Sequence, residues 1–397
     1  MSKATPSNQS PRYSRVWPIV PVLVLTGIWL VSIFLPTESP EDLVPVRRSW
    51  TVMGTVLEAT VYRPATATAL VHDDLETVHD VVLEIDRLMS LYRPDSELVA
   101  FNNQSGMGPV PISAPTFQVF QASQHYRRLS GGALDVTIQP LVELWGFYQM
   151  DRTSTPSPED LQAVLGRIGG DRLDLDSAAK QAALANGSRI DLGSIAKGYA
   201  IDRAVAELDA RGVPAALIDL GGNIGVLGQP PEGRPWSVGI QNPRENNLIG
   251  RLQFRSGAVA TSGDYDRYFE VGGKRFSHLL DPRTGWPAAE LYAVTVVAPN
   301  ATAADALSTA AFILGPEDGM TLLSQCQGVE GVLIQRSVDE QESSQLAVST
   351  TTGSNPEGAI TFALEPETNA ILRSWIEGSE ASILPDCVFP IAPEQLP

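Results

Sequence analysis

An almost continuously apolar segment, residues 16–35, constrains this chain more than any other feature of its sequence. It has the ~20 residues that a helix needs to cross a bilayer. Its flanks are basic before it and acidic after it: Lys3, Arg12 and Arg15 against Glu38, Glu41 and Asp42. The positive-inside rule therefore predicts a short cytoplasmic segment (1–15), a single-pass anchor in the cytoplasmic membrane, and an exported remainder on the periplasmic or extracytoplasmic side.

A cleaved signal peptide is the alternative interpretation of the same segment. Its apolar region should be ~7–15 residues long and be followed by an A-x-A pattern of small residues. Here the apolar stretch is longer and ends in Phe34-Leu35-Pro36, which favours an uncleaved anchor. The proline-rich and acidic residues 36–48 then predict a linker between the anchor and the exported part.

The composition excludes several classes of protein without naming one. The 46 acidic residues outnumber the 28 basic residues and give a formal net charge of −18. This balance argues against a duplex-binding protein, because such a protein needs a basic face. Cys326 and Cys387 are the only cysteines, too few for a disulfide framework or a four-cysteine zinc site. Export permits a disulfide between them, but their spacing does not decide whether they pair.

The exported part shows no internal repeat and no clean internal linker, so we expect one bilobed domain (49–336) and a C-terminal extension (337–397). Residues 50–62 are rich in β-branched and aromatic residues and predict a strand pair with a break at Gly54. The spacing of apolar residues predicts helices over 73–91, 116–129, 158–168 and 301–314. Asp73 or Asp74 is the expected N-cap of the first helix.

The run R-I-D-L-G-S-I-A-K-G-Y-A at 189–200 predicts a short strand ending in Asp191, a glycine turn, and a helix opened by Lys197 and Gly198. Exposed amides, a lysine and a carboxylate at such a turn are a natural contact for an anion or a nucleotide. A Walker A loop is excluded, because G-x-x-x-x-G-K-[ST] is absent. A structural turn with a solvated lysine is the alternative, and this run alone does not decide between the two.

A second apolar strand runs into Leu220-Gly221-Gly222-Asn223. Paired glycines allow a positive φ and a close approach of the backbone to a ligand. A β-hairpin turn, which Gly-Gly and Gly-Asn also form, explains the same residues equally well.

His278 and Asp281 lie three residues apart in a turn closed by Pro282 and Gly285, after a hairpin predicted over 269–276. A histidine beside a carboxylate in an irregular loop can act as a general base. A loop histidine that makes a structural hydrogen bond is the alternative.

On the helix predicted over 301–314, Asp305, Ser308 and Thr309 stand at i, i+3 and i+4 and so share one face. One carboxylate with hydroxyl oxygens suits Mg²⁺, which keeps several waters and shares its other positions with substrate phosphates. Taken alone, an ordinary helix N-terminus explains this motif better.

Taken together and in this order, these motifs resemble the FAD:protein FMN transferase family, the ApbE-type flavinyltransferases. The resemblance runs from Met53-Gly54-Thr55 to Leu314-Gly315, and more weakly to about Ile334. It also covers Met89-Ser90-x-Tyr92, Gly132 to Thr137, and Ala260-Thr261-Ser262-Gly263-x-Tyr265. Each motif is weak by itself, but their ordered occurrence over most of the exported part is specific.

The resemblance implies an α+β fold, in which a bilobed catalytic domain has mixed and antiparallel sheets with packed helices, is related to the T-fold, and follows one N-terminal transmembrane helix. It implies Mg²⁺-dependent transfer of FMN from FAD to a threonine or serine hydroxyl of a target protein, with release of AMP. The targets would be exported flavoproteins, such as flavin-bearing subunits of redox complexes in the bacterial inner membrane. Nucleic acid is not an expected partner.

The resemblance also assigns roles to individual residues. His278 would be the catalytic base that deprotonates the incoming hydroxyl. The FAD contacts would be Met53, Tyr92, Ala133, Leu134, Asp135, Asp191, Lys197 and Leu279. The Mg²⁺ site would comprise Ser194, Asp305, Ser308 and Thr309, some of them through backbone oxygens.

Two other functions would use the same site. Water in place of the acceptor would make the protein an FAD pyrophosphatase that yields FMN and AMP, and loss of turnover would leave a non-catalytic flavin carrier or assembly factor. One residue departs from the family pattern: Asp219 stands where asparagine is more common, and its charge would weaken FAD binding unless it points into the fold. The extension 337–397 is also longer than the family leads us to expect.

Overall fold

The structure is a computed structural model that describes residues 43–149, 154–336, 346–351, 360–365, 370–374, 384 and 386–391. Residues 43–397 form one unit. The predicted cytoplasmic segment, the predicted anchor (16–35) and most of the predicted linker lie outside the described residues. Within the ranges given above, no helix has both the length and the apolar character of a membrane span.

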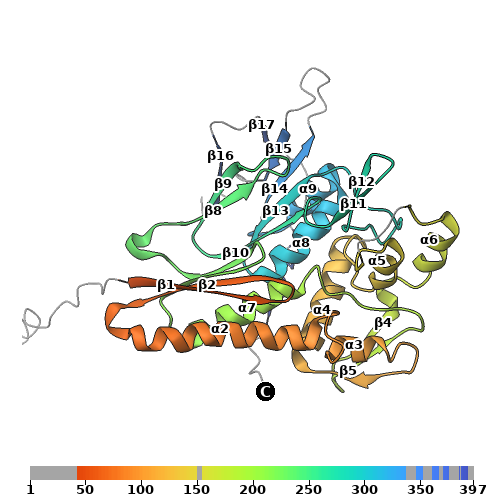
Figure 1. Cartoon of the computed structure of the whole chain (residues 1–397), viewed down its shortest axis with the longest axis horizontal. Helices are drawn as coiled ribbons and strands as arrows, with labels where there is room; N and C mark the ends of the chain where they lie inside the picture. Colours follow the sequence, from red (N-terminus) through yellow and green to blue (C-terminus); the bar gives the residue numbers. More distant parts are fainter. Residues whose placement is uncertain are drawn as a thin grey trace, which may run out of the picture. The chain divides into compact units, whose positions relative to one another are not determined.

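A nine-stranded mixed sheet is the centre of the unit (Figure 1). Neighbouring strands run antiparallel, except for the parallel pair β15–β17 at one edge. In spatial order the strands are β1 (Leu43–Val52), β2 (Thr55–Pro64), β6 (Ala215–Leu220), β7 (Asn223–Gly228), β10 (Gly257–Gly263), β13 (Ala293–Ala298), β14 (Glu330–Arg336), β15 (Leu346–Thr350) and β17 (Ala370–Ser374). The strand pair predicted over 50–62 is the β1–β2 hairpin, with Met53 and Gly54 as its turn.

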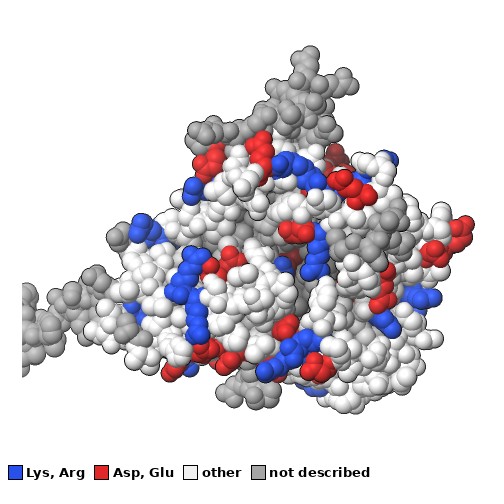
Figure 2. All heavy atoms as spheres, viewed as in Figure 1, with Lys and Arg blue, Asp and Glu red and all other residues white. Residues whose placement is uncertain are grey.

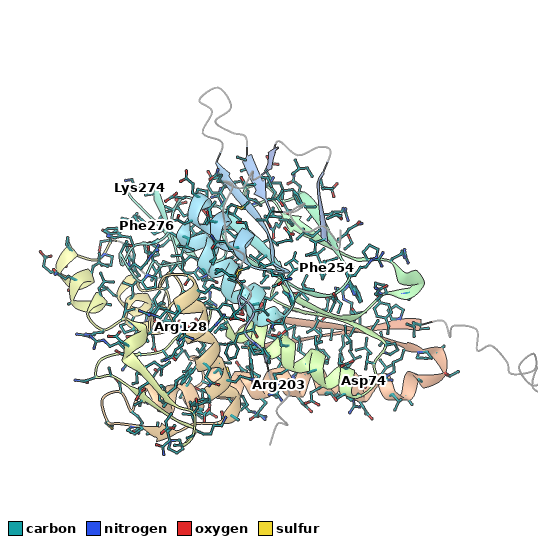
Figure 3. The ribbon with its side chains drawn as sticks, turned by 180° about the vertical axis from the view of Figure 1, so that it is seen from behind. Asp74, Arg128, Arg203, Phe254, Lys274 and Phe276 are labelled. Carbon is teal, nitrogen blue, oxygen red and sulfur yellow. A yellow bond between two sulfur atoms is a disulfide. The ribbon has the colours of Figure 1, made fainter. Side chains whose placement is uncertain are left out.

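Successive residues along the central strands face opposite layers, and this alternation builds two cores. On β10, Ala260 packs into the core under the helices, whereas Val259 packs into the core on the other face. The helical layer comprises α2 (Thr68–Met89), α7 (Ala196–Ala210), α8 (Ala301–Leu314) and α9 (Pro316–Gln325). The other face carries a small sheet of β8 (Trp236–Gln241), β9 (Leu248–Phe254) and β16 (Ile360–Leu364), in which Phe254 is fully buried (Figure 3).

A second lobe lies beside the helical layer (Figure 1). Its elements are α3 (Glu97–Asn102), β3 (Val110–Pro111), α4 (Ala114–Leu129), α5 (Gln139–Trp145), α6 (Pro158–Leu165), β4 (Leu173–Asp176), β5 (Gln181–Leu184) and the hairpin β11 (Tyr268–Val271) to β12 (Lys274–Ser277). An aromatic cluster joins α5 to that hairpin, because Trp145, Phe147, Phe269 and Phe276 pack with ring centroids 5.0 to 6.0 Å apart. The predicted α+β class with mixed and antiparallel sheets is therefore confirmed. The described residues also form 3₁₀ turns at η1 (Ala65–Ala67), η2 (Gly170–Arg172) and η3 (Pro231–Gly233).

The first helix departs from its prediction. It begins at Thr68 rather than near residue 73, so neither Asp73 nor Asp74 is its N-cap. Asp74 is instead fully buried and accepts hydrogen bonds from Arg63 of β2 and Arg211 after α7 (Figure 3). From the sequence alone, an aspartate that is buried against two distant arginines looks the same as an aspartate that caps a helix. The prediction was wrong for this reason.

The other predicted helices agree closely with the structure, and one predicted strand does not. α8 has the predicted bounds, α4 begins two residues before position 116, and α6 ends three residues before position 168. The strand expected before Asp191 is reduced to an isolated bridge between Ile138 and Arg189.

The C-terminal extension contributes strands to both sheets and is linked to the unit by a disulfide. β15 and β17 extend the large sheet, and β16 extends the small one. Cys326 and Cys387 form a disulfide with their Cα atoms 5.3 Å apart, which answers the question that their spacing left open. Just beyond it, the Phe389 N–H donates to the hydroxyl of Tyr126 (3.1 Å), and the Phe389 carbonyl accepts from Nδ2 of Asn300 (3.2 Å).

Charged side chains of both signs are interspersed over the face drawn in Figure 2. Charged side chains also pair between neighbouring elements of the protein, as Arg47 does with Glu58 and Arg48 with Glu76. The charge pattern of this face is therefore mixed rather than basic.

Candidate active site

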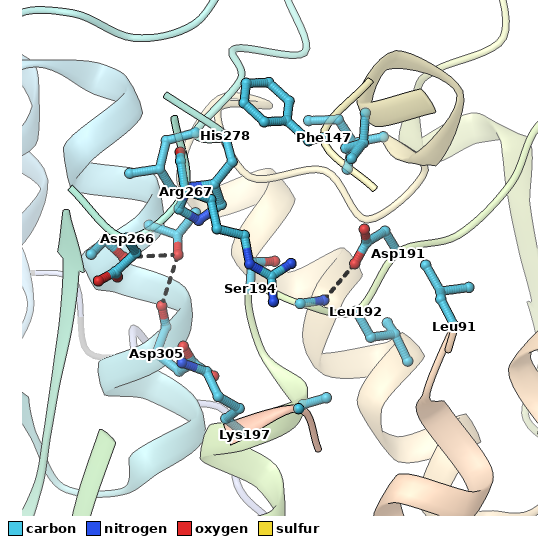
Figure 4. A pocket seen from close by; sticks show the side chains of 18 of the residues that line it. Leu91, Phe147, Asp191, Leu192, Ser194, Lys197, Asp266, Arg267, His278 and Asp305 are labelled. Atoms are coloured by element: carbon cyan, nitrogen blue, oxygen red, sulfur yellow. Dashed lines mark hydrogen bonds between the residues drawn. The ribbon is translucent and has the colours of Figure 1, made fainter. Parts of the chain in front are cut away.

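A cavity of about 470 Å³ is lined by segments of both lobes (Figure 4). Its walls come from the β1–β2 turn, the end of α2 and the loop that follows it, the loop after α4, and the segment after α5. The turn before α7, the β6–β7 turn, the end of β10 with the loop that follows it, the segment after β12 and one face of α8 also line it. The fold thus brings segments that are distant in the sequence around one space.

Every predicted site residue except Ser308 lines this cavity. They are Met53, Tyr92, Ala133, Leu134, Asp135, Asp191, Ser194, Lys197, His278, Leu279, Asp305 and Thr309. Ser308 is fully buried on α8, and its hydroxyl lies 3.0 Å from that of Ser262. The roles of these residues as FAD and Mg²⁺ contacts stay predictions.

Helix α7 begins at Ala196, and its second residue, Lys197, lines the cavity. The next residue, Gly198, lies where α7 meets the start of α8. A Cβ at Gly198 would stand 2.2 Å from the carbonyl oxygen of Ala301, so the approach of the two helices requires glycine there. This approach allows the Gly198 N–H to donate to Oδ2 of Asp305 over 2.9 Å.

Asp202, one turn further along α7, holds the start of α8 from the same side. Its carboxylate accepts hydrogen bonds from the N–H groups of Ala301 (2.6 Å) and Thr302 (2.8 Å) and from the Thr302 hydroxyl (2.5 Å). Burial raises the pKa of Asp202 to about 6, although these hydrogen bonds oppose the rise. Sequence reasoning gave Asp202 no role, because its partners lie about 100 residues away.

Asp305 is the carboxylate of the predicted metal site. It is buried, and burial raises its pKa, although the positive charge of Lys197 opposes the rise. The Thr309 hydroxyl donates to the main-chain oxygen of Asp305 (3.2 Å) and lies 3.1 Å from the hydroxyl of Ser262. One carboxylate among hydroxyl and carbonyl oxygens is a donor set that suits a hard cation.

Among the described residues, Asp305 does not belong to a cluster of three metal-ligating side chains. Across the described part of the chain, no group of three or more such side chains could hold a metal ion. An ion at Asp305 would therefore take its remaining ligands from water and substrate, as Mg²⁺ typically does. The donor set fits Mg²⁺ better than a transition metal, which prefers nitrogen or sulfur ligands.

His278 follows β12 and is oriented by the main chain of Arg267. The Arg267 carbonyl accepts a hydrogen bond from the His278 N–H (3.0 Å) and lies 3.2 Å from its Nδ1. Because a carbonyl can only accept, Nδ1 carries the proton and Nε2 keeps its lone pair. Burial and the positive charges of Arg267 and Lys197 lower the pKa of His278 to about 4. His278 is therefore neutral at pH 7 and able to accept a proton at Nε2.

The carboxylate that the sequence placed beside His278 has another partner. Asp281 accepts hydrogen bonds from Nε and Nη2 of Arg283, both at 2.9 Å, and from the Arg283 N–H at 2.8 Å. The expected histidine–carboxylate pair is absent among these described residues, because Asp281 folds back onto its own turn.

Three side chains that sequence reasoning did not select also line the cavity: Tyr148, Asp266 and Arg267. The Tyr148 hydroxyl donates to Oδ2 of Asp191 (2.5 Å), and Nη1 of Arg267 donates to the hydroxyl of Tyr92 (2.9 Å). The rings of Tyr92 and Tyr148 pack edge to face, 6.2 Å apart. These residues lie next to the recognised motifs, but no sequence pattern marks them. Their position at the cavity could therefore be found only from the fold.

The carboxylate of Asp135 forms hydrogen bonds to neighbouring residues of the protein. It accepts from Nε of Arg127 (2.6 Å) and from the N–H (2.9 Å) and hydroxyl (2.6 Å) of Thr137. These bonds fix the wall formed by Ala133 and Leu134, which are buried.

Met53 reaches the cavity through an uncommon backbone conformation. Its φ is 51° and that of Gly54 is 69°, the pattern of a two-residue hairpin turn with both central residues left-handed. A non-glycine residue with positive φ is costly, and such residues gather at functional sites. Here the turn places the half-buried Met53 at the cavity wall.

The carboxylate of Asp219 is bonded within its own turn. Its Oδ1 accepts a hydrogen bond from the N–H of Gly222 (2.8 Å) and so closes the turn between β6 and β7. Of that turn, Gly221 lines the cavity and Asp219 does not. The hairpin-turn interpretation of the glycine pair is therefore confirmed, and Gly221 also forms part of the cavity wall, where contact with a ligand stays a prediction.

Comparison with known proteins places this fold and cavity in a family. The ApbE family model matches residues 53–333. Curated relatives named FAD:protein FMN transferase include those of Haemophilus influenzae (32% identical over 307 residues, 75% of this chain and 89% of that protein) and Treponema pallidum (36% identical over 306 residues, 72% of this chain and 83% of that protein).

Solved structures agree with the sequence relatives. Pseudomonas stutzeri flavinyl transferase ApbE in its apo form is similar with a TM-score of 0.70, 30% identity, and coverage of 79% of this chain and 97% of that chain. The ApbE protein of Thermotoga maritima gives a TM-score of 0.68 and 32% identity over 74% of this chain and 94% of that one. These relatives identify the chain as a transferase. The chain belongs to the ApbE family, and the resemblance seen in its motifs is confirmed.

Proposed function

We propose that this protein transfers FMN from FAD to a threonine or serine hydroxyl of an exported target protein and releases AMP. The observation that carries the proposal is the single cavity that His278, Lys197 and Asp305 line from three separate segments (Figure 4). The relatives named FAD:protein FMN transferase support the same reaction.

In this reaction the acceptor hydroxyl attacks the phosphorus atom on the FMN side of the FAD pyrophosphate. A new phosphate ester bond forms, the P–O bond to AMP breaks, and AMP leaves with the bridging oxygen. Nε2 of His278 accepts the hydroxyl proton. A histidine with a pKa of about 4 is a weak base, but the negative pyrophosphate would offset the positive charges of Lys197 and Arg267 and raise that pKa.

Oxygens of Asp305, Thr309 and Ser194 would hold Mg²⁺, and Ser308 would support them by packing against Ser262. When bound, the ion supplies positive charge that stabilises phosphoryl oxygens in the transition state. Lys197 adds a second positive charge at the N-terminus of α7, where the helix dipole also favours an anion. Catalysis would rest on positioning and electrostatic stabilisation rather than on a covalent intermediate with the protein.

The test uses the full-length protein with FAD, MgCl₂ and an exported flavoprotein encoded beside its gene. We expect flavin fluorescence that stays on the denatured target and one AMP for each flavin transferred. His278→Gln should reduce transfer by about 10² to 10⁴-fold, the usual contribution of a general base, while FAD binding persists. His72→Gln, which changes an exposed histidine on α2, is the matched control and should transfer normally.

Two outcomes would contradict this function. AMP release that is independent of the acceptor would make the protein an FAD pyrophosphatase. FAD binding without AMP release, with or without the acceptor, would make it a flavin carrier. Asp305→Asn tests the metal: Mg²⁺ should raise the unfolding temperature of the wild type in the presence of ADP, by the linkage of binding to stability, and should have little effect on the variant.

We further propose that residues 16–35 anchor the chain in the bacterial inner membrane with the catalytic domain on the periplasmic side. The basic residues before this segment support that orientation, and the disulfide is typical of an oxidising compartment. A protease added to spheroplasts should digest the domain and spare a cytoplasmic marker. Protection of the domain would contradict the proposed orientation.

A further inference from the structure

Arg267 is the arginine among the described residues that line the cavity, and its guanidinium group has an unusual partner. Elsewhere in the described residues, arginines form ion pairs with carboxylates, as Arg127 does with Asp135, Arg283 with Asp281 and Arg244 with Asp264. Among the described residues, the Arg267 side chain forms no ion pair, and its hydrogen-bond partner is the neutral hydroxyl of Tyr92. A guanidinium carries five N–H donors, so most of those of Arg267 stay available to an anion.

The position of Arg267 suits such an anion. Its side chain extends into the cavity (Figure 4). Together with Lys197 it supplies the permanent positive charge among the described lining residues. Its main-chain carbonyl is the group that orients His278. Arg267 therefore supplies both a cation to the cavity and the carbonyl that orients His278, the predicted proton acceptor.

Electrostatics agree with this placement. Burial raises the pKa of Asp266, and the positive charges of Lys197 and Arg267 oppose that rise. The same two charges, after burial, lower the pKa of His278. Both cations thus act on the same two groups, Asp266 and His278, so their positive charges reach one region of the cavity.

The hydroxyl of Tyr92 holds the guanidinium in this position. The Nη1 atom of Arg267 lies 2.9 Å from that hydroxyl, and its guanidinium carbon lies 5.9 Å from the centre of the ring. Tyr92 itself is packed edge to face against Tyr148, whose hydroxyl is bonded to Asp191. Two hydrogen bonds and one ring contact therefore connect Asp191 to Arg267 along the cavity wall.

We infer that Arg267 binds the diphosphate group of the flavin dinucleotide, and that the hydroxyl of Tyr92 is the positioning group that holds its guanidinium ready. The inference rests on the proposed function in naming FAD as the substrate. The recognised chemistry is the diphosphate, which FAD shares with ADP and which riboflavin lacks. An arginine can donate two parallel hydrogen bonds to phosphoryl oxygens, and such charge-assisted bonds are among the strong ones in proteins.

The test measures binding of ADP with Mg²⁺, and separately of riboflavin, to the full-length protein by calorimetry. Arg267→Ala should weaken ADP binding by about 10- to 100-fold, the range for a lost charge-assisted hydrogen bond, and should leave riboflavin binding within about twofold. Arg267→Lys should restore part of the loss. Arg275→Ala is the matched control, because it removes the same charge from the β11–β12 hairpin, where Arg275 lies over Tyr268 outside the cavity.

The hydroxyl of Tyr92 is tested with Tyr92→Phe, which keeps the ring. We expect a several-fold loss of ADP affinity in the wild-type background and no further loss in the Arg267→Ala background, because the hydroxyl acts through the guanidinium. Equal losses in the two backgrounds would overturn the positioning role of Tyr92. ADP affinity of Arg267→Ala equal to that of Arg275→Ala would overturn the inference for Arg267.

These measurements are independent of turnover. ADP and riboflavin binding needs neither an acceptor protein nor AMP release, so a protein that binds ADP through Arg267 but transfers no flavin contradicts the proposed function alone. Flavin transfer that proceeds in Arg267→Ala with unchanged KM for FAD contradicts the inference alone. Unfolding midpoints of all variants show whether each is folded. If Arg267→Ala does not fold, Arg267→Lys provides the test of ADP binding in its place.

Discussion

The N–H of Gly198 and Oδ2 of Asp305 are joined by a hydrogen bond of 2.9 Å that links the first turn of α7 to α8. Lys197, the residue before Gly198, lines the cavity beside Asp305. The bond therefore fixes a predicted phosphate contact relative to a predicted metal ligand. It forms only because the two backbones approach more closely at position 198 than any Cβ allows.

Gly198→Ala should disturb both stability and the site. The added Cβ would meet the Ala301 carbonyl oxygen at 2.2 Å, and a backbone atom cannot move aside as the end of a flexible side chain can. Overpacking of this kind typically costs about 1–3 kcal/mol. Urea unfolding should show that loss, and calorimetry should show weaker binding of Mg²⁺ with ADP because Asp305 is displaced.

Gly166→Ala is the control for this substitution. Gly166 has a φ of −64°, and an added Cβ would lie 3.7 Å from its nearest neighbour, the carbonyl oxygen of Ala163. Its free energy of unfolding should stay within about 0.5 kcal/mol of the wild type. Equal behaviour of the two variants would show that close approach at Gly198 is not a constraint.

Local patterns in the sequence predicted the elements that carry the site. The start of α7 and the bounds of α8 follow from apolar spacing, and the turns at Gly54 and at Gly272-Gly273 follow from glycine placement. These predictions succeeded because each depends on residues within one or two turns of each other. The order of the motifs then predicted which segments meet, through resemblance rather than through physics.

Contacts between distant residues could not be predicted in this way. The Tyr148–Asp191 and Arg267–Tyr92 hydrogen bonds join residues 43 and 175 positions apart, and no periodicity signals such a pair. The opposite error occurred for Asp281, where a short sequence separation predicted a pair that does not form. Asp281 lies three residues from His278 but bonds to Arg283 in its own turn. Sequence spacing therefore indicates the residue types of the site better than their partners.

The low pKa of His278 predicts its titration. A pKa of about 4 lies below the value of about 6.5 for an exposed histidine, so protonation disfavours the folded state. The stability linked to His278 should be complete above pH 6.5 and be lost as the pH falls from 6.5 toward 4. An NMR titration of its ring protons should show a midpoint near 4, shifted upward when ADP offsets the charges of Lys197 and Arg267.

His278→Gln serves as the reference for this titration. Its unfolding temperature should fall less than that of the wild type between pH 6.5 and 4, because the linked proton uptake is removed. A wild-type midpoint at 6.5, unmoved by ADP, would contradict the proposed electrostatic coupling between His278 and the two cations.

The buried ion cluster at Asp74 should be a major source of stability. Burial alone would raise the pKa of Asp74, but hydrogen bonds from Arg63 and Arg211 outweigh it and hold that pKa below its usual value. Asp74→Asn leaves the buried Arg63 without its counter-charge, which should cost about 3–5 kcal/mol. Because the folded pKa is depressed, this stability should be present above about pH 4 and be lost as the pH falls through the folded pKa.

Asp73→Asn gives the matched comparison for Asp74. Asp73 is the exposed neighbour on the same helix, so its substitution should change the free energy of unfolding by no more than about 0.5 kcal/mol. Urea unfolding of both variants at pH 7 measures the difference. Similar small losses in both would mean that the cluster contributes no more than an ordinary surface ion pair.

The disulfide should stabilise the unit and, with it, the start of α8. Cys326 and Cys387 are 61 residues apart, and the chain-entropy model gives about 4 kcal/mol for a loop of that size. The linked segment also contacts Asn300, whose side chain caps α8 through the N–H of Ala303 (2.8 Å) while donating to the carbonyl of Phe389. Reduction should therefore lower the urea midpoint of the wild type and weaken Mg²⁺ binding at Asp305 on the same helix. The double variant Cys326→Ala/Cys387→Ala should be less stable from the start and insensitive to reductant, whereas an unchanged wild-type midpoint under reductant would show that the Phe389 contacts alone hold the segment in place.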